Sequence, residues 1–382
     1  MPELIANAQG LLLAREADRQ TAPDWIAHLE ALPPEVVESA LDREVPASWG
    51  LAEALVDRSK EAIFSTQPEA AIRFAKLATE VAERVDSTLY GEALIRDLQA
   101  QTLGALGNAY RVAGRFDLAV RTLEEVDRRL FEGTGDPLES ATLLSLLASL
   151  QTDLGDYELA RDLLDEAITV YRDLDDTRLL GRTLLQKGVV LVYLDPANSF
   201  STLSEAVRFL DPKVEPRLFL MARHTQICAL EASGRAAEAD HLLETSRALY
   251  RHGGSEWLTL RLAWVEARIC CGLGRLDEAD AGLNVVLTEV LERQLHLDAA
   301  LAALDLALCR LLQGRSREAA ELAASMAAMF QAWGVHRRAL EAWSVVQHAL
   351  ATETATVTLL RDVAGYLTRA WKNPDIPFAV SP

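Results

Sequence analysis

The sequence contains few of the residues on which disulfide-bonded or metal-bound folds depend. Of its 382 residues, four are cysteine and seven are histidine. The histidines form no H-E-x-x-H motif, and no C-x-x-C pair occurs among the cysteines Cys228, Cys270, Cys271 and Cys309. A disulfide framework and a metal site are therefore not expected. We expect the cysteines to be small buried side chains in a reducing compartment.

The sequence also lacks long apolar runs and an excess of positive charge. No segment approaches the roughly 18 uninterrupted apolar residues of a membrane-spanning helix. The first twenty residues lack the basic start and apolar core of a signal peptide. With 57 acidic against 38 basic residues, the formal net charge is −19, which disfavours direct binding to nucleic acid. We therefore expect a cytoplasmic protein with neither a membrane nor a nucleic-acid partner.

Motifs of nucleotide binding and hydrolysis are missing as well. No Walker sequence, G-x-G-x-x-G or G-x-S-x-G occurs, and no strand is predicted that could carry one. Carboxylates are abundant, as in "DLGDYE" from Asp153, but they fall on turns and outer helix faces, where ordinary surface charge explains them. We expect neither an enzyme nor a bound cofactor.

What the sequence does contain is a repeat of about 40 residues. Glycine opens five similar fragments: "GRFDLA" at Gly114, "GDYELA" at Gly155, "GRAAEA" at Gly234, "GRLDEA" at Gly274 and "GRSREA" at Gly314. The spacings are 41, 79, 40 and 40 residues. The longest spacing fits two periods, with Asp195-Pro196 in place of the missing glycine turn. A fixed period of this length is typical of a helical-repeat solenoid.

Each fragment indicates a turn between two helices. Glycine accepts the left-handed backbone that ends a helix. Five residues after each glycine stands an alanine, and a small side chain there lets the two helices cross closely; these are Ala119, Ala160, Ala239, Ala279 and Ala319. The pattern predicts an all-α helical-repeat solenoid of about seven helix pairs, one of them degenerate at its turn.

The segment "LGNAYRVAGRFDLAVRTLEEV" resembles a tetratricopeptide repeat (TPR). Leu106, Gly107, Tyr110 and Ala119 match the family pattern in order, and Gly114 matches its turn. The period is longer than the about 34 residues of that family, so the chain is similar to the long-helix arrays of kinesin light chain and of bacterial peptide-sensing regulators. The resemblance covers residues 51–351 and implies a right-handed superhelix.

Weaker copies of the repeat flank the strong ones and suggest three parts. Residues 1–46 form a helical lead-in, which we expect to be broken at Pro23 and at Pro33-Pro34. Residues 47–351 form the TPR-like repeat array. Residues 352–382 form a C-terminal capping helix with an extended tail.

The resemblance also implies a concave groove lined by the first helix of each pair. It assigns to that groove the residues six and three before, and one and four after, the position of Gly107. The candidate peptide-binding residues at these positions are Asn108, Arg111, Arg182, His224, Arg261, Trp264 and Arg268, and Gln186 lies beside them. Four arginines stand there against one carboxylate, Glu231, which favours an acidic segment held by forked hydrogen bonds, with Trp264 as an aromatic plate.

Two questions stay open at this point. The groove assignment can be shifted by one residue, in which case Trp264 belongs to the core and the arginines form a structural network with Glu231 and neighbouring acids. The favoured function is an interaction or scaffold protein that binds a protein or peptide segment. The alternative is a ligand- or peptide-sensing regulatory module of a bacterial transcription or signalling system. Neither the partner nor the oligomeric state follows from the sequence.

Overall fold

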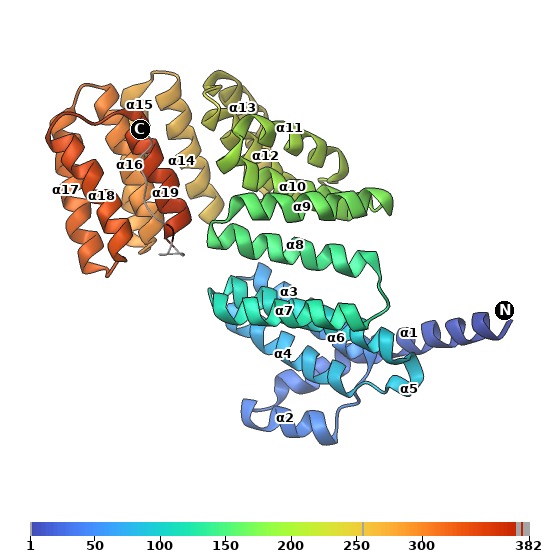
Figure 1. Cartoon of the computed structure of the whole chain (residues 1–382). Helices are drawn as coiled ribbons and strands as arrows, with labels where there is room; N and C mark the ends of the chain where they lie inside the picture. The colour runs from blue at the N-terminus through green and yellow to red at the C-terminus, as the bar shows by residue number, and fades with distance from the viewer. Residues whose placement is uncertain (1, 254–255, 372–375, 377–382) are drawn as a thin grey trace. The chain divides into compact units, whose positions relative to one another are not determined.

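Helices make up all the regular structure in the described part of the chain. The structure, a computed structural model, describes residues 2–253, 256–371 and 376 (Figure 1). No strand occurs among these residues, so the all-α prediction is confirmed. The helices are α1 Pro2–Ala31, α2 Pro34–Arg43, α3 Trp49–Phe64, α4 Pro68–Arg84, α5 Ser87–Tyr90, α6 Glu92–Val112, α7 Phe116–Glu132, α8 Pro137–Leu154, α9 Tyr157–Asp173, α10 Thr177–Leu194, α11 Pro196–Phe209, α12 Pro216–Ala232, α13 Ala236–Gly253, α14 Glu256–Gly272, α15 Leu276–Glu292, α16 His296–Leu312, α17 Ser316–Ala332, α18 Arg337–Ala351 and α19 Val357–Ala370.

From α3 onward, apart from the one-turn helix α5, the helices follow one another as helix–turn–helix pairs. In the part of the chain that the structure describes, these pairs are α3–α4, α6–α7, α8–α9, α10–α11, α12–α13, α14–α15, α16–α17 and α18–α19. Their succession is the TPR-like helical repeat that the glycine–alanine pattern predicts, and the eight pairs of the described residues exceed the expected seven by one.

The turn glycines have the backbone conformation that their positions require. Gly114, Gly155, Gly234, Gly274 and Gly314 all have positive φ angles, between 71° and 82°. At Gly274 the N–H of the glycine bonds to the carbonyl of Cys271, and the next N–H bonds to the carbonyl of Cys270, which closes the end of α14 as a Schellman turn. The degenerate turn lies at Asp195, whose side chain accepts a hydrogen bond from the N–H of Asn198 and so caps α11.

Small residues allow the two helices of a pair to cross closely. The five alanines of the repeat are fully buried, as predicted. Glycine has the same role elsewhere in the pairs. A Cβ atom at Gly107 would lie 2.8 Å from Leu123 Cδ2, and one at Gly188 would lie 2.4 Å from Leu203 Cγ. Side chains of the second helix therefore occupy the space that a larger residue on the first helix would need.

The contacts divide the chain into two compact units. Unit 1 comprises Met1–Leu150 with Thr169–Leu174, and unit 2 comprises Gln151–Ile168 with Asp175–Pro382. This division does not fall at residues 46 or 351. The three-part organisation and the right-handed superhelix stay predictions.

The lead-in differs from the prediction at Pro23. Helix α1 continues through this proline, and only the break at Pro33-Pro34 is confirmed. The helix packs against α3, where a Cβ atom at Gly50 would lie 2.4 Å from the backbone nitrogen of Arg19. Ala22, next to the proline, is fully buried. These contacts compensate for the one backbone hydrogen bond that proline cannot donate.

The predicted extended tail, residues 372–382, lies outside the described residues except for Ile376. The carbonyl of this residue accepts a hydrogen bond of 3.1 Å from the hydroxyl of Tyr366.

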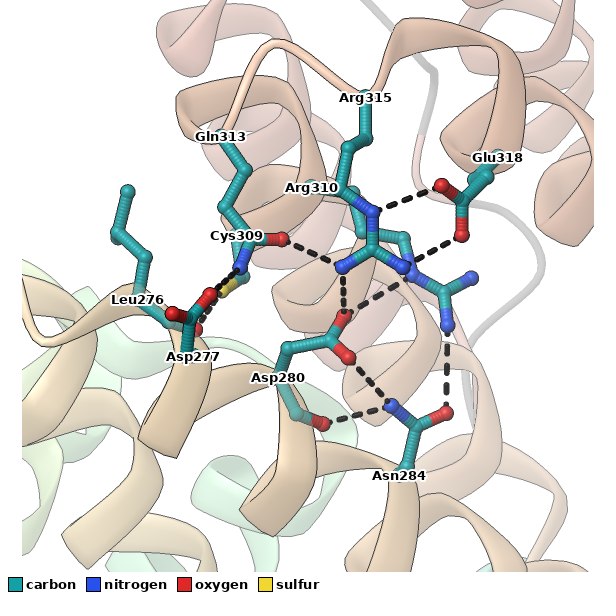
Figure 2. A network of polar contacts seen from close by, with 9 residues as sticks. All are labelled: Leu276, Asp277, Asp280, Asn284, Cys309, Arg310, Gln313, Arg315 and Glu318. Atoms are coloured by element: carbon teal, nitrogen blue, oxygen red, sulfur yellow. Dashed lines mark hydrogen bonds and ion pairs between the residues drawn. The ribbon is translucent and has the colours of Figure 1, made fainter.

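An arginine directly after the turn glycine joins neighbouring pairs. Arg115 lies 2.9 Å from Glu69 on α4, and Arg275 lies 3.4 Å from Asp240 on α13. Figure 2 shows the most extensive example, in which Arg315 and Arg310 lie 3.3 and 3.1 Å from Asp280 on α15. In each case the turn of one pair is tied to the second helix of the pair before it.

The last pair covers part of the pair before it. Helix α19 contacts α16, and Leu360, Val363 and Leu367 share a core cluster with Leu304. Leu304 of α16 therefore packs in the core beneath the C-terminal helix and does not form an open apolar surface.

Candidate functional site

The candidate site lies in unit 2, on the first helices of four successive pairs. Helices α10, α12, α14 and α16, all labelled in Figure 1, each contact the next one along the series. We call these four helices the first-helix row. Apart from Asn108 and Arg111, every predicted binding residue lies on this row.

Arg182 on α10 forms the first of three ion pairs along the row. Its Nε lies 2.8 Å from Oε1 of Glu215, the residue just before α12 begins. Arg178 lies 3.5 Å from the same carboxylate oxygen. The side chain of Arg182 is 39% exposed, against 10% for that of Glu215.

Arg261 on α14 forms the second pair. One of its terminal nitrogens lies 2.9 Å from Oδ1 of Asp298 on α16, and the side chains are 35% and 15% exposed. The guanidinium also lies over two indole rings, 4.4 Å from the centroid of Trp257 and 5.3 Å from that of Trp264. Burial raises the pKa of Asp298, and the charge of Arg261 opposes this shift.

Arg268 on α14 forms the third pair, with Glu231 on α12, and lies 3.9 Å from Asp305 on α16. Its side chain is 39% exposed, against 13% for Glu231. Burial alone would lower the pKa of Arg268, but Glu231 and Asp305 raise it overall. Burial raises the pKa of Glu231, while Arg268 lowers it.

The three pairs share one arrangement, in which the carboxylate is more buried than its arginine. The buried acid holds the guanidinium in place, and the arginine side chain is the more exposed member of each pair. A guanidinium has five N–H donors in a planar fork, so an arginine bonded to one acid still has donors for a second acceptor. Each arginine of the row therefore has more N–H donors than one carboxylate can use.

The prediction that arginines outnumber carboxylates on this face is wrong. Glu215, Asp298 and Asp305 stand beside the arginines in addition to Glu231. Sequence reasoning missed them because they lie outside the four groove positions per repeat that the TPR pattern defines. Asp305 lies two residues before Ala307, the counterpart of Gly107, and Glu215 lies before its helix begins.

The role expected for Trp264 is also wrong. This side chain is only 6% exposed and belongs to the core cluster of unit 2. Its indole N–H donates a 2.8 Å hydrogen bond to Asp305. The ring fills space between α14 and α16 and offers almost no surface to a ligand. The exposed aromatic residue beside Arg261 is Trp257.

The other predicted residues fall into two groups. Asn108 and Arg111 belong to unit 1, where the amide oxygen of Asn108 accepts a 3.0 Å hydrogen bond from Arg111. Gln186 and His224 belong to the first-helix row and are half-buried. His224 lies 3.0 Å from the hydroxyl of Tyr250 and 3.7 Å from the sulfur of Cys228.

Tyr193 at the end of α10 was not predicted and marks a partly enclosed position on the row. Its side chain is 52% exposed, yet burial raises its pKa, and Arg261 and Arg268 are close enough to oppose that shift. Its ring stacks on that of Tyr157, with centroids 4.6 Å apart and planes 6° apart.

Metal ligands and membrane-spanning helices can be considered for the described residues together. Within residues 2–253, 256–371 and 376, no group of three or more His, Cys, Asp and Glu side chains could hold a metal ion. In the same ranges, no helix combines the length and the apolar character needed to cross a bilayer.

Comparison with known proteins relates the fold to solved helical-repeat structures. No protein-family model and no curated protein sequence matches the chain. Aspartyl phosphate phosphatase F from Bacillus subtilis is similar in structure, with a TM-score of 0.56, 15% sequence identity, and coverage of 78% of this chain and 75% of that one. A Rap protein complexed with competence and sporulation factor is also similar, with a TM-score of 0.47 and 13% sequence identity. The match covers 83% of this chain and 99% of that one. At these identities the likeness concerns the fold, and it agrees with the TPR-like prediction.

Proposed function

We propose that this chain is a binding protein that holds an extended protein or peptide segment on the first-helix row of unit 2. The observation that supports it is the shared order of the three ion pairs, with buried carboxylates behind accessible arginines. Arg182, Arg261 and Arg268 would donate to carbonyl or carboxylate oxygens of the segment. Trp257 would pack against one of its apolar side chains.

The chemistry of the row favours a segment rich in acceptors. Buried Glu215, Asp298 and Glu231 already balance the charges of the three arginines, so a strongly acidic ligand would meet less net attraction than three unpaired arginines would offer. Backbone carbonyls of an extended chain, with one or two carboxylates, accept hydrogen bonds from such arginines without requiring a net charge attraction. The proposed occupant is therefore an extended, moderately acidic segment in the cytoplasm.

The test is selection of binders from a peptide library, followed by affinity measurement with arginine-to-lysine variants. Replacement by alanine would leave buried Asp298 or Glu231 without a partner and would destabilise the fold. Lysine keeps the charge and the ion pair but lacks the planar fork. We expect the double variant Arg261→Lys, Arg268→Lys to bind selected peptides about tenfold more weakly, a loss of about 1.4 kcal/mol, with little change in melting temperature.

The matched control is Arg317→Lys on α17, where an almost fully exposed arginine pairs only with Glu321. This variant is expected to bind as the wild type does. A double variant that melts at a lower temperature yet binds its peptides unchanged would show that Arg261 and Arg268 are purely structural. Library selection without any enriched peptide would reject the proposal altogether.

Two other activities are measured on the same preparation. The name of the phosphatase with a similar fold suggests hydrolysis of an aspartyl phosphate, and the regulatory alternative suggests DNA binding. We expect no phosphate release from an aspartyl-phosphorylated protein, because the proposed function is binding without catalysis. We also expect no DNA mobility shift, because the acidic chain repels the DNA phosphates. A positive result in either assay would replace the proposed function with a regulatory one.

A further inference from the structure

Three side chains of unit 2 form a cluster whose chemistry peptide binding does not use. Cys228 and His224 lie four residues apart on one face of α12, with the sulfur 3.7 Å from Nε2 of the imidazole. The other ring nitrogen, Nδ1, lies 3.0 Å from the hydroxyl of buried Tyr250 on α13. This is the order of a nucleophile, a base and a group that orients the base.

The tyrosine contact determines what the imidazole can do. Burial raises the pKa of Tyr250, so the phenol stays protonated and its oxygen can accept a hydrogen bond from Nδ1–H. A neutral imidazole with its proton on Nδ1 has a lone pair on Nε2, the atom that faces the sulfur. His224 can therefore take the thiol proton and hold it next to the thiolate.

Charged groups around the thiol favour its ionised form. Burial alone would raise the pKa of Cys228, but His224 and then Arg268 lower it overall. Burial would lower the pKa of His224, and the neighbouring Cys228 raises it overall. The charged and titratable groups that act on these two side chains are Tyr193 on α10, Glu231 on α12, Tyr250 on α13, and Arg261 and Arg268 on α14.

The other three cysteines lack such an arrangement. Cys309 is fully buried and donates its S–H to the carbonyl of Leu276 at 3.3 Å (Figure 2). Burial raises its pKa to about 12. Burial likewise raises the pKa of Cys270 and of Cys271. Cys228 is the partly exposed thiol that the structure places beside a base.

We propose that Cys228 is a covalent modification site, at which a thiolate formed by proton transfer to His224 reacts with a hydroperoxide. The sulfur attacks the terminal oxygen of the hydroperoxide, so that an S–O bond forms and the O–O bond breaks. Two electrons pass from sulfur to the leaving oxygen. The imidazolium returns its proton to that oxygen, which departs as water or an alcohol, and the cysteine becomes a sulfenic acid.

The experiment treats the full-length protein with a small excess of hydrogen peroxide and traps sulfenic acid with dimedone. Mass spectrometry then measures the rate of labelling at each of the four cysteines, at pH 6 and pH 8.5. We expect Cys228 to be labelled at least tenfold faster than the others at pH 6. Its rate should fall less between pH 8.5 and pH 6 than that of a thiol of ordinary pKa, near 8.5, which slows by about a hundredfold.

Two histidine variants separate a specific role of His224 from general accessibility. His224→Gln removes the base, and we expect Cys228 to slow by about tenfold or more at pH 6 while labelling of Cys270 stays unchanged. The control is His241→Gln, a change at an exposed histidine on α13, which should leave the Cys228 rate unaltered. Circular dichroism of each variant verifies that it is folded.

Either of two results would overturn the proposal. One is equal labelling of Cys228, Cys270 and Cys271 in the wild type. The other is a folded His224→Gln protein in which Cys228 keeps its rate at pH 6. The peptide-binding assay is not involved, so the outcome is independent of the proposed function.

Discussion

At the scale of single residues, the contacts of an arginine in the first-helix row depend on the side chains around it more than on its own charge. The arginines of the first-helix row occupy positions that the TPR pattern assigns to a groove. What the pattern does not contain is the carboxylate that Arg182 or Arg261 contacts, because Glu215 and Asp298 come from a different repeat from their partners. Such pairs depend on how neighbouring helices are placed, and a periodic reading of one helix at a time cannot find them.

The same dependence on surroundings predicts an effect of pH at Glu139. Burial, together with Asp136 and Asp97, raises the pKa of this carboxyl to about 7. The folded state therefore favours the protonated acid. The stability this provides is fully present below the unfolded pKa, near 4.3, and is lost as the pH rises through about 7.

We expect Glu139→Gln to reduce the loss of unfolding free energy between pH 5 and pH 8 by about 1–3 kcal/mol. Urea denaturation at the two pH values measures it. Glu92→Gln is the control, since Glu92 is also an acid in the first turn of a helix of unit 1 but is exposed. Identical pH dependence in wild type and Glu139→Gln would show that this carboxyl ionises freely.

A second prediction at this scale concerns the crossing of α14 and α15. Ala279 is fully buried there, so the added volume in Ala279→Leu forces the helices apart at a cost of about 1–3 kcal/mol. The control is Ala281→Leu on the exposed side of the same helix. Chemical denaturation compares the two variants. Equal midpoints would place the close crossing elsewhere.

At the scale of helices, the repeat period predicts most of what is found. Glycine and alanine report directly on backbone conformation and on close approach, so the turns at Gly114 or Gly274 and the buried Ala119 or Ala279 could be predicted from spacing alone. Pro23 could not. Whether a helix continues through a proline depends on the packing gained on both sides of it, and the contact between α1 and α3 is not encoded in a local pattern.

That contact yields a prediction about α1. A methyl group at Gly50 would lie 2.4 Å from the backbone nitrogen of Arg19 and 2.5 Å from the carbonyl carbon of Asp18. Backbone atoms cannot move aside as a side-chain tip can. We expect Gly50→Ala to detach α1 from α3, seen as faster hydrogen exchange in residues 15–31.

Gly10→Ala is the control for this change, because nothing lies within 4 Å of a Cβ atom at that position of α1. The substitution should stabilise the helix slightly, by about 0.5–1 kcal/mol. Protected amides in α1 of the Gly50→Ala protein would mean that the two helices shift without separating.

At the scale of the whole molecule, the net charge of −19 opposes compaction. Each exposed ion pair contributes little to stability. Salt should therefore weaken the repulsion among the excess acidic side chains more than it weakens the attraction within the ion pairs. We expect the melting temperature to rise by roughly 2–4 °C, or about 1 kcal/mol, when sodium chloride increases from 20 to 300 mM. Choline chloride at equal ionic strength should have the same effect. A fall in melting temperature would mean that the ion pairs outweigh the repulsion.

The arginine after the turn glycine also bears on how such a chain can lengthen. Residues 234–273 contain both residue types of the ion pair that links neighbouring repeats. Arg235 stands one residue after the glycine, and Asp240 stands six residues after it. Residues 274–313 carry Arg275 and Asp280 at the same two places. A tandem duplication of either segment would supply an acid and an arginine in matching register, so the new copy could bond to its own template. Gene duplication in steps of 40 residues would therefore produce an array in which each new repeat already carries the arginine and the aspartate that pair with its neighbours.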